Sequence, residues 1–324
     1  MPPRKVQSFD LNGIPNNDCI GKCNSDKRKE VTDGDLCNMV KSVRDNLPVR
    51  CVGEQALRKI YLLCQYFGAF TNAMRHHFKG RMNYVEICSG PGRCIFRESK
   101  EEVDGTALSV VQHPNFDLIN KAIFIDYNER VVKILQNRIN NLDKSNVASA
   151  QIGDYNNIPQ ISSILSGLTK DCLNLVFIDP TDCSLPFSAV REISRILNKV
   201  DFIINFAVFS DPARHLRHAL LSKDRYSASR QKYSNFIGND VFFNNPDNIR
   251  LAEKDGTEED LRERFKEEYC NSFRKMGYLY YDPVRINKYY LFFASREEIA
   301  LNLWKNIQRR DELGQTSLIP QLFQ

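Results

Sequence analysis

The stretch Asn83-Tyr-Val-Glu-Ile-Cys-Ser-Gly-Pro-Gly-Arg93 decides the fold, because an apolar run suited to a buried strand ends here in an acid and a glycine-bearing turn. Before it, residues 56–74 place apolar side chains at steps of three and four, which predicts one long amphipathic helix. After it, apolar runs alternate with helical patterns. A strand that feeds such a turn is how a doubly wound α/β domain builds a nucleotide site at the carboxyl edge of its sheet.

The residues after the turn predict four more strand–helix alternations and a hairpin. Strands are expected at 121–126, 147–152, 173–179 and 200–206, and helices at 128–142, 158–168, 187–197 and 212–221. We expect a loop over 93–104, a short helix after Gly105, and a helix that starts with a capping box at Thr257 and Asp260. Aromatic strands at 278–281 and 289–293, joined by 282–288, predict a hairpin. The fold predicted is α/β, with a doubly wound, mostly parallel seven-stranded sheet, helices on both faces and an antiparallel edge hairpin.

Length and composition place the chain among ordinary globular proteins. It has 324 residues, a hydrophobic fraction of 42%, a charged fraction of 26% and a formal charge of +5. No apolar run approaches the roughly 20 residues needed to span a bilayer, and the start lacks the apolar core of a secretory signal, so we expect a cytoplasmic protein without membrane contact. We expect a polar, partly disordered arm over 1–50, a main domain over 51–310 with an insertion or lid at about 222–257, and a tail over 311–324.

Four cysteines near the amino terminus raise the question of a zinc site. Cys19, Cys23, Cys37 and Cys51 supply enough thiolates for a closed tetrahedral site. Structural zinc sites usually show two tight pairs, whereas only one pair is tight here and no histidine accompanies it. We therefore favour unrelated reduced thiols and predict no metal.

Acidic residues at successive strand ends indicate which nucleotide the turn would hold. Glu86, Asp126 and Asp179 each end a predicted strand, and Asp154 lies just past another. A carboxylate beside a glycine turn accepts the hydroxyl protons of a ribose. The turn lacks the third small residue of a dinucleotide motif and Pro91 removes an amide, which disfavours a pyrophosphate; no P-loop is present. A phosphate-free nucleoside fits better, and S-adenosylmethionine is the commonest one on such folds.

The predicted cofactor residues follow from these positions. Glu86 would bind the amino group of the cofactor, the glycines of the turn would admit its amino-acid part, and Asp126 would bind the ribose or else cap the next helix. The pair Asp154 and Asn156 would flank the adenine or else form a turn. The full predicted set is Glu86, Ser89, Gly90, Gly92, Arg93, Asp126, Tyr127, Asp154, Tyr155 and Asn156.

The predicted catalytic residues are Asp179, Pro180 and Asn205. Methyl transfer is an in-line displacement, so the protein mainly aligns the acceptor and removes a proton where needed. Enzymes that methylate amino groups of nucleic acids often carry Asp-Pro-Pro-Tyr, whose aromatic ring stacks on a flipped base. This chain has Asp179-Pro-Thr-Asp182, which lowers the case for a nucleobase acceptor without removing it.

The sequence resembles the three-Cys-motif partner family over about residues 50–310. The resemblance rests on Tyr84-Val-Glu-Ile-Cys-Ser-Gly-Pro-Gly-Arg93, Phe124-Ile-Asp126, Gly153-Asp154, Phe177-Ile-Asp-Pro180 and Tyr289-Tyr-Leu-Phe-Phe-Ala294. It implies a Rossmann-like class I methyltransferase fold that uses S-adenosylmethionine. It names no methyl acceptor, and the cysteines of the family name belong to the family's genetic partner.

Two other functions stay open from the sequence. Residues 211–236, hereafter the basic segment, interleave cations with Tyr226, Tyr233 and Phe236, and would line a nucleic-acid groove or else form a solvated face. A non-catalytic module of the same fold would use this surface to bind nucleic acid or a partner protein. His215 and His218 are expected at the surface. A nuclease built on the acids is the third hypothesis, and it requires a divalent metal.

Overall fold

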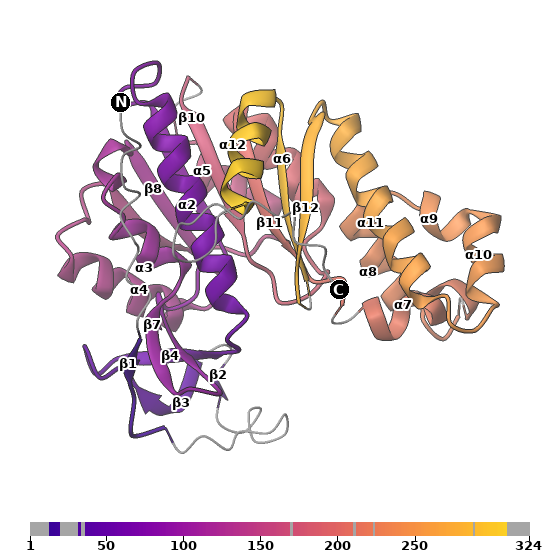
Figure 1. Ribbon diagram of the computed structural model, residues 1–324, viewed down its shortest axis with the longest axis horizontal. Helices are drawn as coiled ribbons and strands as arrows, with labels where there is room; N and C mark the ends of the chain where they lie inside the picture. The colour runs from indigo at the N-terminus through magenta and orange to yellow at the C-terminus, as the bar shows by residue number, and fades with distance from the viewer. Residues whose placement is uncertain are drawn as a thin grey trace. The chain divides into compact units, whose positions relative to one another are not determined.

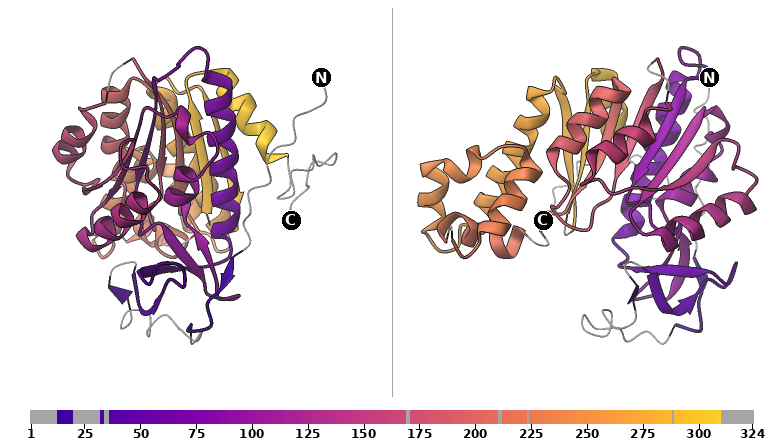
Figure 2. Two further views of the ribbon diagram at one scale, coloured as in Figure 1. Left: turned by 90° about the vertical axis from the view of Figure 1, so that its left-hand side faces the viewer. Right: turned by 180° about the vertical axis from the view of Figure 1, so that it is seen from behind.

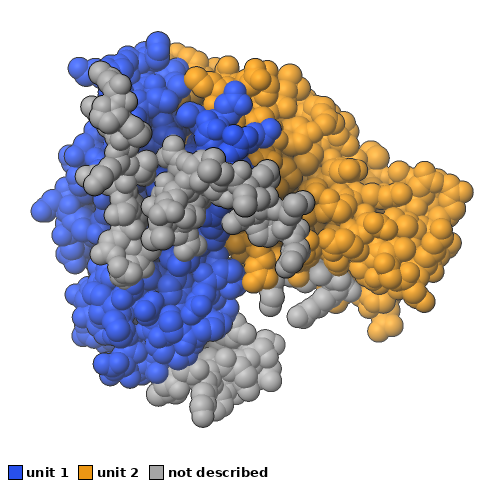
Figure 3. Space-filling view, viewed as in Figure 1, with its two compact units in different colours: residues 1–82, 89–152, 302–324 blue, residues 83–88, 153–301 orange. Residues whose placement is uncertain are grey.

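The protein is described by a computed structural model (Figure 1), which Figure 2 shows from two further sides. It describes residues 13–19, 32–33, 36–168, 171–209, 212–222, 224–287 and 289–309. The chain divides into two compact units (Figure 3): unit 1 holds residues 1–82, 89–152 and 302–324, and unit 2 holds 83–88 and 153–301. The predicted tail at 311–324 and much of the predicted arm, including Cys23, lie outside the described residues.

Unit 1 contains a small six-stranded sheet that the sequence did not predict. Its order is β1-β7-β6-β4-β3-β2. The strands are β1 (Ile14–Pro15), β2 (Thr32–Asp33), β3 (Leu36–Lys41), β4 (Pro48–Val52), β6 (Arg93–Phe96) and β7 (Glu101–Asp104). The structure thus differs from the expectation of a loose arm at 36–50 and of a loop at 93–104. The reason is that these short strands find partners far along the chain: β4 pairs in parallel with β6, and β1 pairs with β7.

The rest of unit 1 follows the predicted order of helices and strands. It comprises α2 (Ala56–Met74), α3 (Thr106–Val111), η1 (Phe116–Leu118), β8 (Lys121–Asp126), α4 (Glu129–Asn141) and β9 (Ala148–Ile152), with the last part of α12 (Glu298–Gln308). Strands β8 and β9 pair in parallel, with Asp126 opposite Ile152. Helix α4 is capped by Asn128, whose side chain accepts hydrogen bonds from the backbone N–H groups of Arg130 and Val131. Asp126 is therefore not the cap of this helix.

Unit 2 carries a mixed β-sheet. Its strands lie in the order β12-β13-β11-β10-β5, with β5 (Met82–Ile87), β10 (Leu173–Ile178), β11 (Lys199–Phe206), β12 (Tyr280–Ile286) and β13 (Tyr289–Ser295). Strands β10 and β11 are parallel, whereas β13 runs antiparallel to both β11 and β12. A mixed α/β fold with a mostly parallel sheet and an edge hairpin is confirmed; the seven-stranded arrangement stays a prediction. The expected connection over 282–288 is wrong, because residues 282–286 continue β12 and pair with β13.

The helices of unit 2 include those of the predicted insertion. They are α5 (Ile158–Leu165), α6 (Phe187–Leu197), α7 (Pro212–Leu221), α8 (Ser227–Ile237), α9 (Val241–Asn244), α10 (Pro246–Ala252) and α11 (Glu258–Lys275). Helices α7 to α11 gather in one group (Figures 1 and 2), and α8, α9 and α10 lie within residues 222–257, where the sequence predicts an insertion or lid. The expected capping box is also wrong. Thr257 donates its hydroxyl to the carbonyls of Leu251 and Lys254 instead of capping α11. Among the described residues, no helix is long and apolar enough to cross a membrane.

An aromatic core joins the helical group to the sheet of unit 2. The Tyr269 ring on α11 stacks on Phe236 of α8 at 4.7 Å and lies 5.0 Å from Phe206 of β11. One turn further along α11, Phe273 lies 4.8 Å from Phe292 of β13. All five rings are fully buried. This packing places the helical group at the end of β11, beside the predicted catalytic residues.

A half-buried histidine in unit 1, His113, links the stability of the protein to pH. The ring of His113 packs edge-on against Phe67 of α2, with ring centroids 5.1 Å apart. Its Nδ1 atom accepts a hydrogen bond of 3.0 Å from the backbone N–H of Asn115, which requires that nitrogen to be unprotonated. Burial lowers the pKa of His113 to about 4, so the folded state keeps the neutral imidazole.

We predict that the free energy of unfolding decreases as the pH falls from about 6.5 to about 4. In this range the unfolded chain binds a proton at His113 that the folded chain does not, so stability present above the range is lost below it, by up to about 3 kcal/mol. Urea unfolding at several pH values measures the slope. His113→Gln should flatten it. His77→Gln, which changes an exposed imidazole, is the control and should leave it unchanged.

Candidate functional site

The glycine turn of unit 1 has a backbone that only glycine adopts easily. Gly90 and Gly92 have φ values of +64° and +87°. A Cβ at Gly92 would lie 2.8 Å from both Leu108 Cγ and Leu135 Cδ1, closer than real contacts allow. At Gly90 such a Cβ would be in ordinary contact with Arg50 Nη1, at 3.7 Å. The turn is therefore too tightly packed for a side chain at Gly92, whereas at Gly90 only the positive φ disfavours one.

Asp126 meets the turn, as the sequence predicted. Its Oδ2 accepts a hydrogen bond of 3.1 Å from the backbone N–H of Gly90, and its Oδ1 accepts one of 3.1 Å from that of Asn128. Two amides thus fix the orientation of a carboxylate that is only 5% exposed. A carboxylate has about four lone-pair positions, so two such bonds leave capacity for further donors.

Two apolar side chains beside Asp126 are exposed at the ends of β8 and β9. Tyr127 follows Asp126 directly and is 63% exposed. Ile152, the register partner of Asp126, is 45% exposed. An aromatic ring and an aliphatic side chain at neighbouring strand ends offer apolar surface to a flat ring system. The sequence analysis named Tyr127 but missed Ile152. The signal that could have identified Ile152 is an apolar residue at the end of a strand that follows a strand ending in an acid.

The other two predicted residues of the turn have different surroundings. Arg93 lies within the small sheet, where its Nη1 donates to Asp45 at 2.8 Å and its Nε donates to Asp104 at 3.1 Å. The guanidinium therefore has partners of its own. Ser89 is 6% exposed, and its hydroxyl has no hydrogen-bond partner among the described residues. A buried hydroxyl without a partner costs about 1–3 kcal/mol, which a ligand that bonds it would recover.

In unit 2, Glu86 is fully buried on β5. Its Oε2 accepts a hydrogen bond of 2.6 Å from the Tyr84 hydroxyl. A buried carboxylate needs such a donor, so this bond gives Glu86 a structural use. Whether it also meets the amino group of a ligand stays a prediction.

Asp154 forms a turn with Asn156, the alternative that the sequence left open. Its Oδ1 accepts bonds from the backbone and side-chain nitrogens of Asn156, at 2.8 and 3.1 Å. Between them, Tyr155 shares a hydrogen bond of 2.6 Å with Ser184. Burial raises the pKa of Tyr155 to about 12, so it stays protonated at neutral pH. The sequence analysis missed Ser184, which continues the loop that Asp179 opens.

The three predicted catalytic residues lie together in unit 2. Asn205 at the end of β11 donates its Nδ2 to Asp179 Oδ1 at 2.8 Å and to the Pro180 carbonyl at 3.0 Å. Two acceptors fix the direction of this amide. Its Oδ1 is buried and has no hydrogen-bond partner among the described residues. Asp179 is 7% exposed, and its charge adds to burial in raising the pKa of Tyr289 on β13.

The basic segment is less available to nucleic acid than its composition indicates. Tyr233 and Phe236 are fully buried. Arg217 donates to Asp255 at 2.8 Å and to the Ala252 carbonyl at 2.7 Å, and Arg230 donates to the Asn244 side chain at 2.8 Å. Two of the three interleaved aromatics are thus core residues, and two cations stabilise the helical group. Lys223 and the Arg214 side chain lie outside the described residues.

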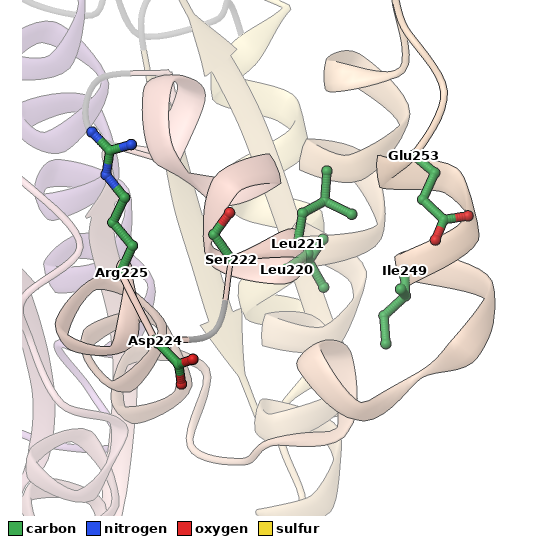
Figure 4. A pocket seen from close by; sticks show the side chains of 7 residues that line it. All are labelled: Leu220, Leu221, Ser222, Asp224, Arg225, Ile249 and Glu253. Carbon is green, nitrogen blue, oxygen red and sulfur yellow. The ribbon is translucent and has the colours of Figure 1, made fainter.

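The part of the basic segment that is not used in the aromatic core or in these hydrogen bonds lies around Tyr226. His218 stacks on its ring at 5.1 Å, and the Arg225 guanidinium lies 5.7 Å from the ring centroid. A cavity of about 560 Å³ lies nearby, lined by the end of α7, the following loop and α10 (Figure 4). Its lining combines Leu220, Leu221 and Ile249 with Asp224, Arg225 and Glu253. None of the predicted cofactor or catalytic residues lines it.

The amino-terminal cysteines pack as small hydrophobic residues. Cys37 belongs to an apolar cluster with Val40, Val49 and Ile95, and Cys19 and Cys51 pack against that cluster. No group of three metal-ligating side chains occurs in the described part of the chain. Because Cys23 lies outside that part, the expectation of no zinc stays a prediction.

No protein-family model and no curated protein matches the chain. Its structure is similar to that of the bifunctional kinase-methyltransferase WbdD, at 13% identity and a TM-score of 0.33, and the match spans 48% of this chain but 30% of WbdD. A candidate S-adenosyl-L-methionine-dependent methyltransferase from Methanococcus maripaludis is 15% identical with a TM-score of 0.36, over 76% of this chain and 88% of that one. Protein LPL1258 from Legionella pneumophila is 9% identical with a TM-score of 0.42, over 75% and 89%. These scores are low, so the likenesses establish neither family nor function.

We predict that Asn205→Asp destabilises the protein by about 1–3 kcal/mol at pH 7, because it replaces a donor to Asp179 with a second carboxylate. Urea unfolding at pH 7 measures the loss. Asn235→Asp, at an exposed position of α8, should change stability little. An Asn205→Asp variant as stable as the wild type would contradict the contact.

Proposed function

We propose that this protein is an S-adenosylmethionine-dependent methyltransferase of the three-Cys-motif partner type, with a seven-stranded class I fold and a cytoplasmic location. The observation that carries the proposal is the buried Asp126 carboxylate, which two backbone amides hold against the glycine turn. The exposed Tyr127 and Ile152 beside it add an apolar surface for a base. A nucleoside without phosphates matches this combination, since it offers ribose hydroxyls to a carboxylate and an aromatic base to apolar side chains.

The residues of the turn fit the amino-acid part of this cofactor. The lack of a side chain at Gly90 would let a ligand approach the backbone, and the Ser89 hydroxyl, which has no partner among the described residues, would donate to the cofactor carboxylate. Glu86 and Arg93 already have protein partners, so their cofactor assignment rests on the sequence pattern. Asp154, Tyr155 and Asn156 remain proposed as residues that flank the adenine.

The chemistry proposed for unit 2 is acceptor alignment and proton removal. S-adenosylmethionine, when bound, supplies an electrophilic methyl group. Asp179 would accept a proton from the acceptor, and Asn205 and the Pro180 carbonyl would hold the carboxylate in place. The orphaned Asn205 oxygen would accept a hydrogen bond from an N–H or O–H group of the acceptor. These residues do not distinguish a nucleic acid, a protein or a small molecule.

Isothermal calorimetry tests the cofactor assignment. We predict a Kd on the order of micromolar for S-adenosylmethionine, weakened about tenfold to a hundredfold by Asp126→Ala, because the ribose hydroxyls lose a charged acceptor. Asp117→Ala, which removes an acid whose side chain is 79% exposed in the same unit, is the matched control and should bind like the wild type. Absence of binding for both S-adenosylmethionine and its demethylated product would reject the function.

The Ser89 hydroxyl allows a sharper test, because stability and binding should respond in opposite directions. Ser89→Ala removes a buried hydroxyl without a partner, so the free protein should be as stable as the wild type or more stable, by up to about 1 kcal/mol. Cofactor affinity should nevertheless fall about tenfold. Thermal unfolding and calorimetry on the same sample measure the two effects. A variant that binds the cofactor at full affinity would exclude Ser89 from the site.

The second candidate function is a non-catalytic module that binds nucleic acid or a partner protein. The observation in its favour is the stacked group of Arg225, Tyr226 and His218. Cofactor binding separates the two functions. A protein that binds no cofactor, but binds an oligonucleotide in a salt-dependent way that Arg225→Gln weakens, would support the module instead.

A further inference from the structure

A buried arginine holds the middle of the glycine turn from behind. Arg138, on α4, has a side chain that is only 1% exposed. Its Nη1 donates a hydrogen bond of 2.6 Å to the carbonyl oxygen of Pro91, the central residue of Gly90-Pro91-Gly92. Pro91 has no N–H group, so its carbonyl is the backbone atom through which the tip of the turn can be held.

Asp45 fixes the direction of this guanidinium. Arg138 Nε donates to Asp45 Oδ2 at 2.8 Å and Nη2 donates to Oδ1 at 3.1 Å, a bidentate pairing in which both groups must keep one orientation. Nη2 also donates to the Pro48 carbonyl at 3.1 Å. Every nitrogen of the guanidinium therefore has an acceptor. Only Nη1 is directed at the turn.

Asp45 also binds a second arginine, Arg93. Its Oδ2 also accepts a bond of 2.8 Å from Nη1 of Arg93, the residue that follows Gly92. Burial opposes ionisation of Asp45, but the hydrogen bonds from Arg138 and Leu47 and the charges of Arg138 and Arg93 outweigh it and lower its pKa. One carboxylate from the β3–β4 connection thus links to the turn at Pro91, through Arg138, and at Arg93 directly.

Pro91 fixes its own φ, but the turn still needs external partners because the glycines on either side of it are flexible. Two glycines in the left-handed region have many accessible conformations in the absence of contacts. Three bonds define the observed shape: Gly90 N–H to Asp126, Gly105 N–H to Gly92 O at 2.7 Å, and Arg138 to Pro91 O. The first involves the proposed cofactor carboxylate, and the third depends on Asp45.

We propose that Arg138 and Asp45 are positioning residues that hold the glycine turn in its cofactor-binding shape, so that the β3–β4 connection of the small sheet controls cofactor affinity. Neither residue touches the cofactor in this scheme. The proposal rests on the function proposed above, in that the turn is taken to bind S-adenosylmethionine.

The experiment combines hydrogen exchange of the free protein with calorimetry. Arg138→Met keeps an unbranched side chain as far as the position of Nε and removes the guanidinium group that donates to Pro91. Lys133→Met is the matched control, because Lys133 is on the same helix with a side chain that is 71% exposed. Asp45→Asn combined with Arg138→Met removes both charges, so no lone carboxylate is left buried and the variant is expected to fold.

We expect the peptide covering residues 88–96 to exchange about tenfold faster in Arg138→Met and in the double variant, with peptides from β10 unchanged in unit 2. S-adenosylmethionine should bind about tenfold to a hundredfold more weakly to both variants at a temperature where each is fully folded. Lys133→Met should match the wild type in both measurements.

Unchanged exchange at 88–96 in the double variant would overturn the proposal, as would full cofactor affinity despite faster exchange. A wild-type protein that binds no cofactor overturns the proposed function and, with it, the link to cofactor affinity. Hydrogen exchange still decides in that case whether Arg138 and Asp45 hold the turn, so the two failures are distinguishable.

Discussion

A turn of two glycines around a proline keeps one shape only if other parts of the chain hold its few polar backbone atoms. Here the partners are a carboxylate at the end of β8, an amide at the start of α3 and a guanidinium on α4. Each belongs to a different element of unit 1, and the guanidinium depends on Asp45 in the small sheet. The conformation that brings Asp126 to Gly90 is thus a property of the whole unit. Residues 83–93, which contain the turn, do not determine this conformation by themselves.

The basic segment likewise shows that local composition does not determine the contacts that residues make in the folded protein. The basic segment has the composition of a nucleic-acid surface, yet Arg217 and Arg230 bond to groups of the neighbouring helices, and Tyr233 and Phe236 belong to the aromatic core. Buried cations need acceptors and aromatic rings bury large apolar areas, so both are often used inside a helical group. Conversely, the Ser89 hydroxyl and the Oδ1 atom of Asn205 are buried polar atoms without a hydrogen-bond partner among the described residues, and both belong to predicted site residues.

Much of the α/β pattern was predictable because its signals are local. Periodic apolar residues marked α2, α4 and α11, and apolar runs that end in acids marked β8 and β10. The small sheet was not predicted because its strands are two to six residues long and two of its pairings, β4 with β6 and β1 with β7, join segments far apart in the sequence. The predicted capping box at Thr257 was wrong for a related reason. The Thr257 hydroxyl donates to the carbonyl oxygen of Leu251 in α10 and makes no capping hydrogen bond with the amides of α11.

The sequence by itself determined the order of the longer strands and helices, the acids at the strand ends and the glycine turn, because these depend on side-chain periodicity and on the backbone freedom of particular residues. Only the tertiary structure decided which of these residues meet. In the fold, Asp126 bonds to Gly90 and Asn205 bonds to Asp179. Ile152 pairs with Asp126, next to Tyr127, and Arg93 bonds to Asp45. Hydrogen bonds and ion pairs act over a few ångströms in space, and distance along the chain does not specify which groups come that close.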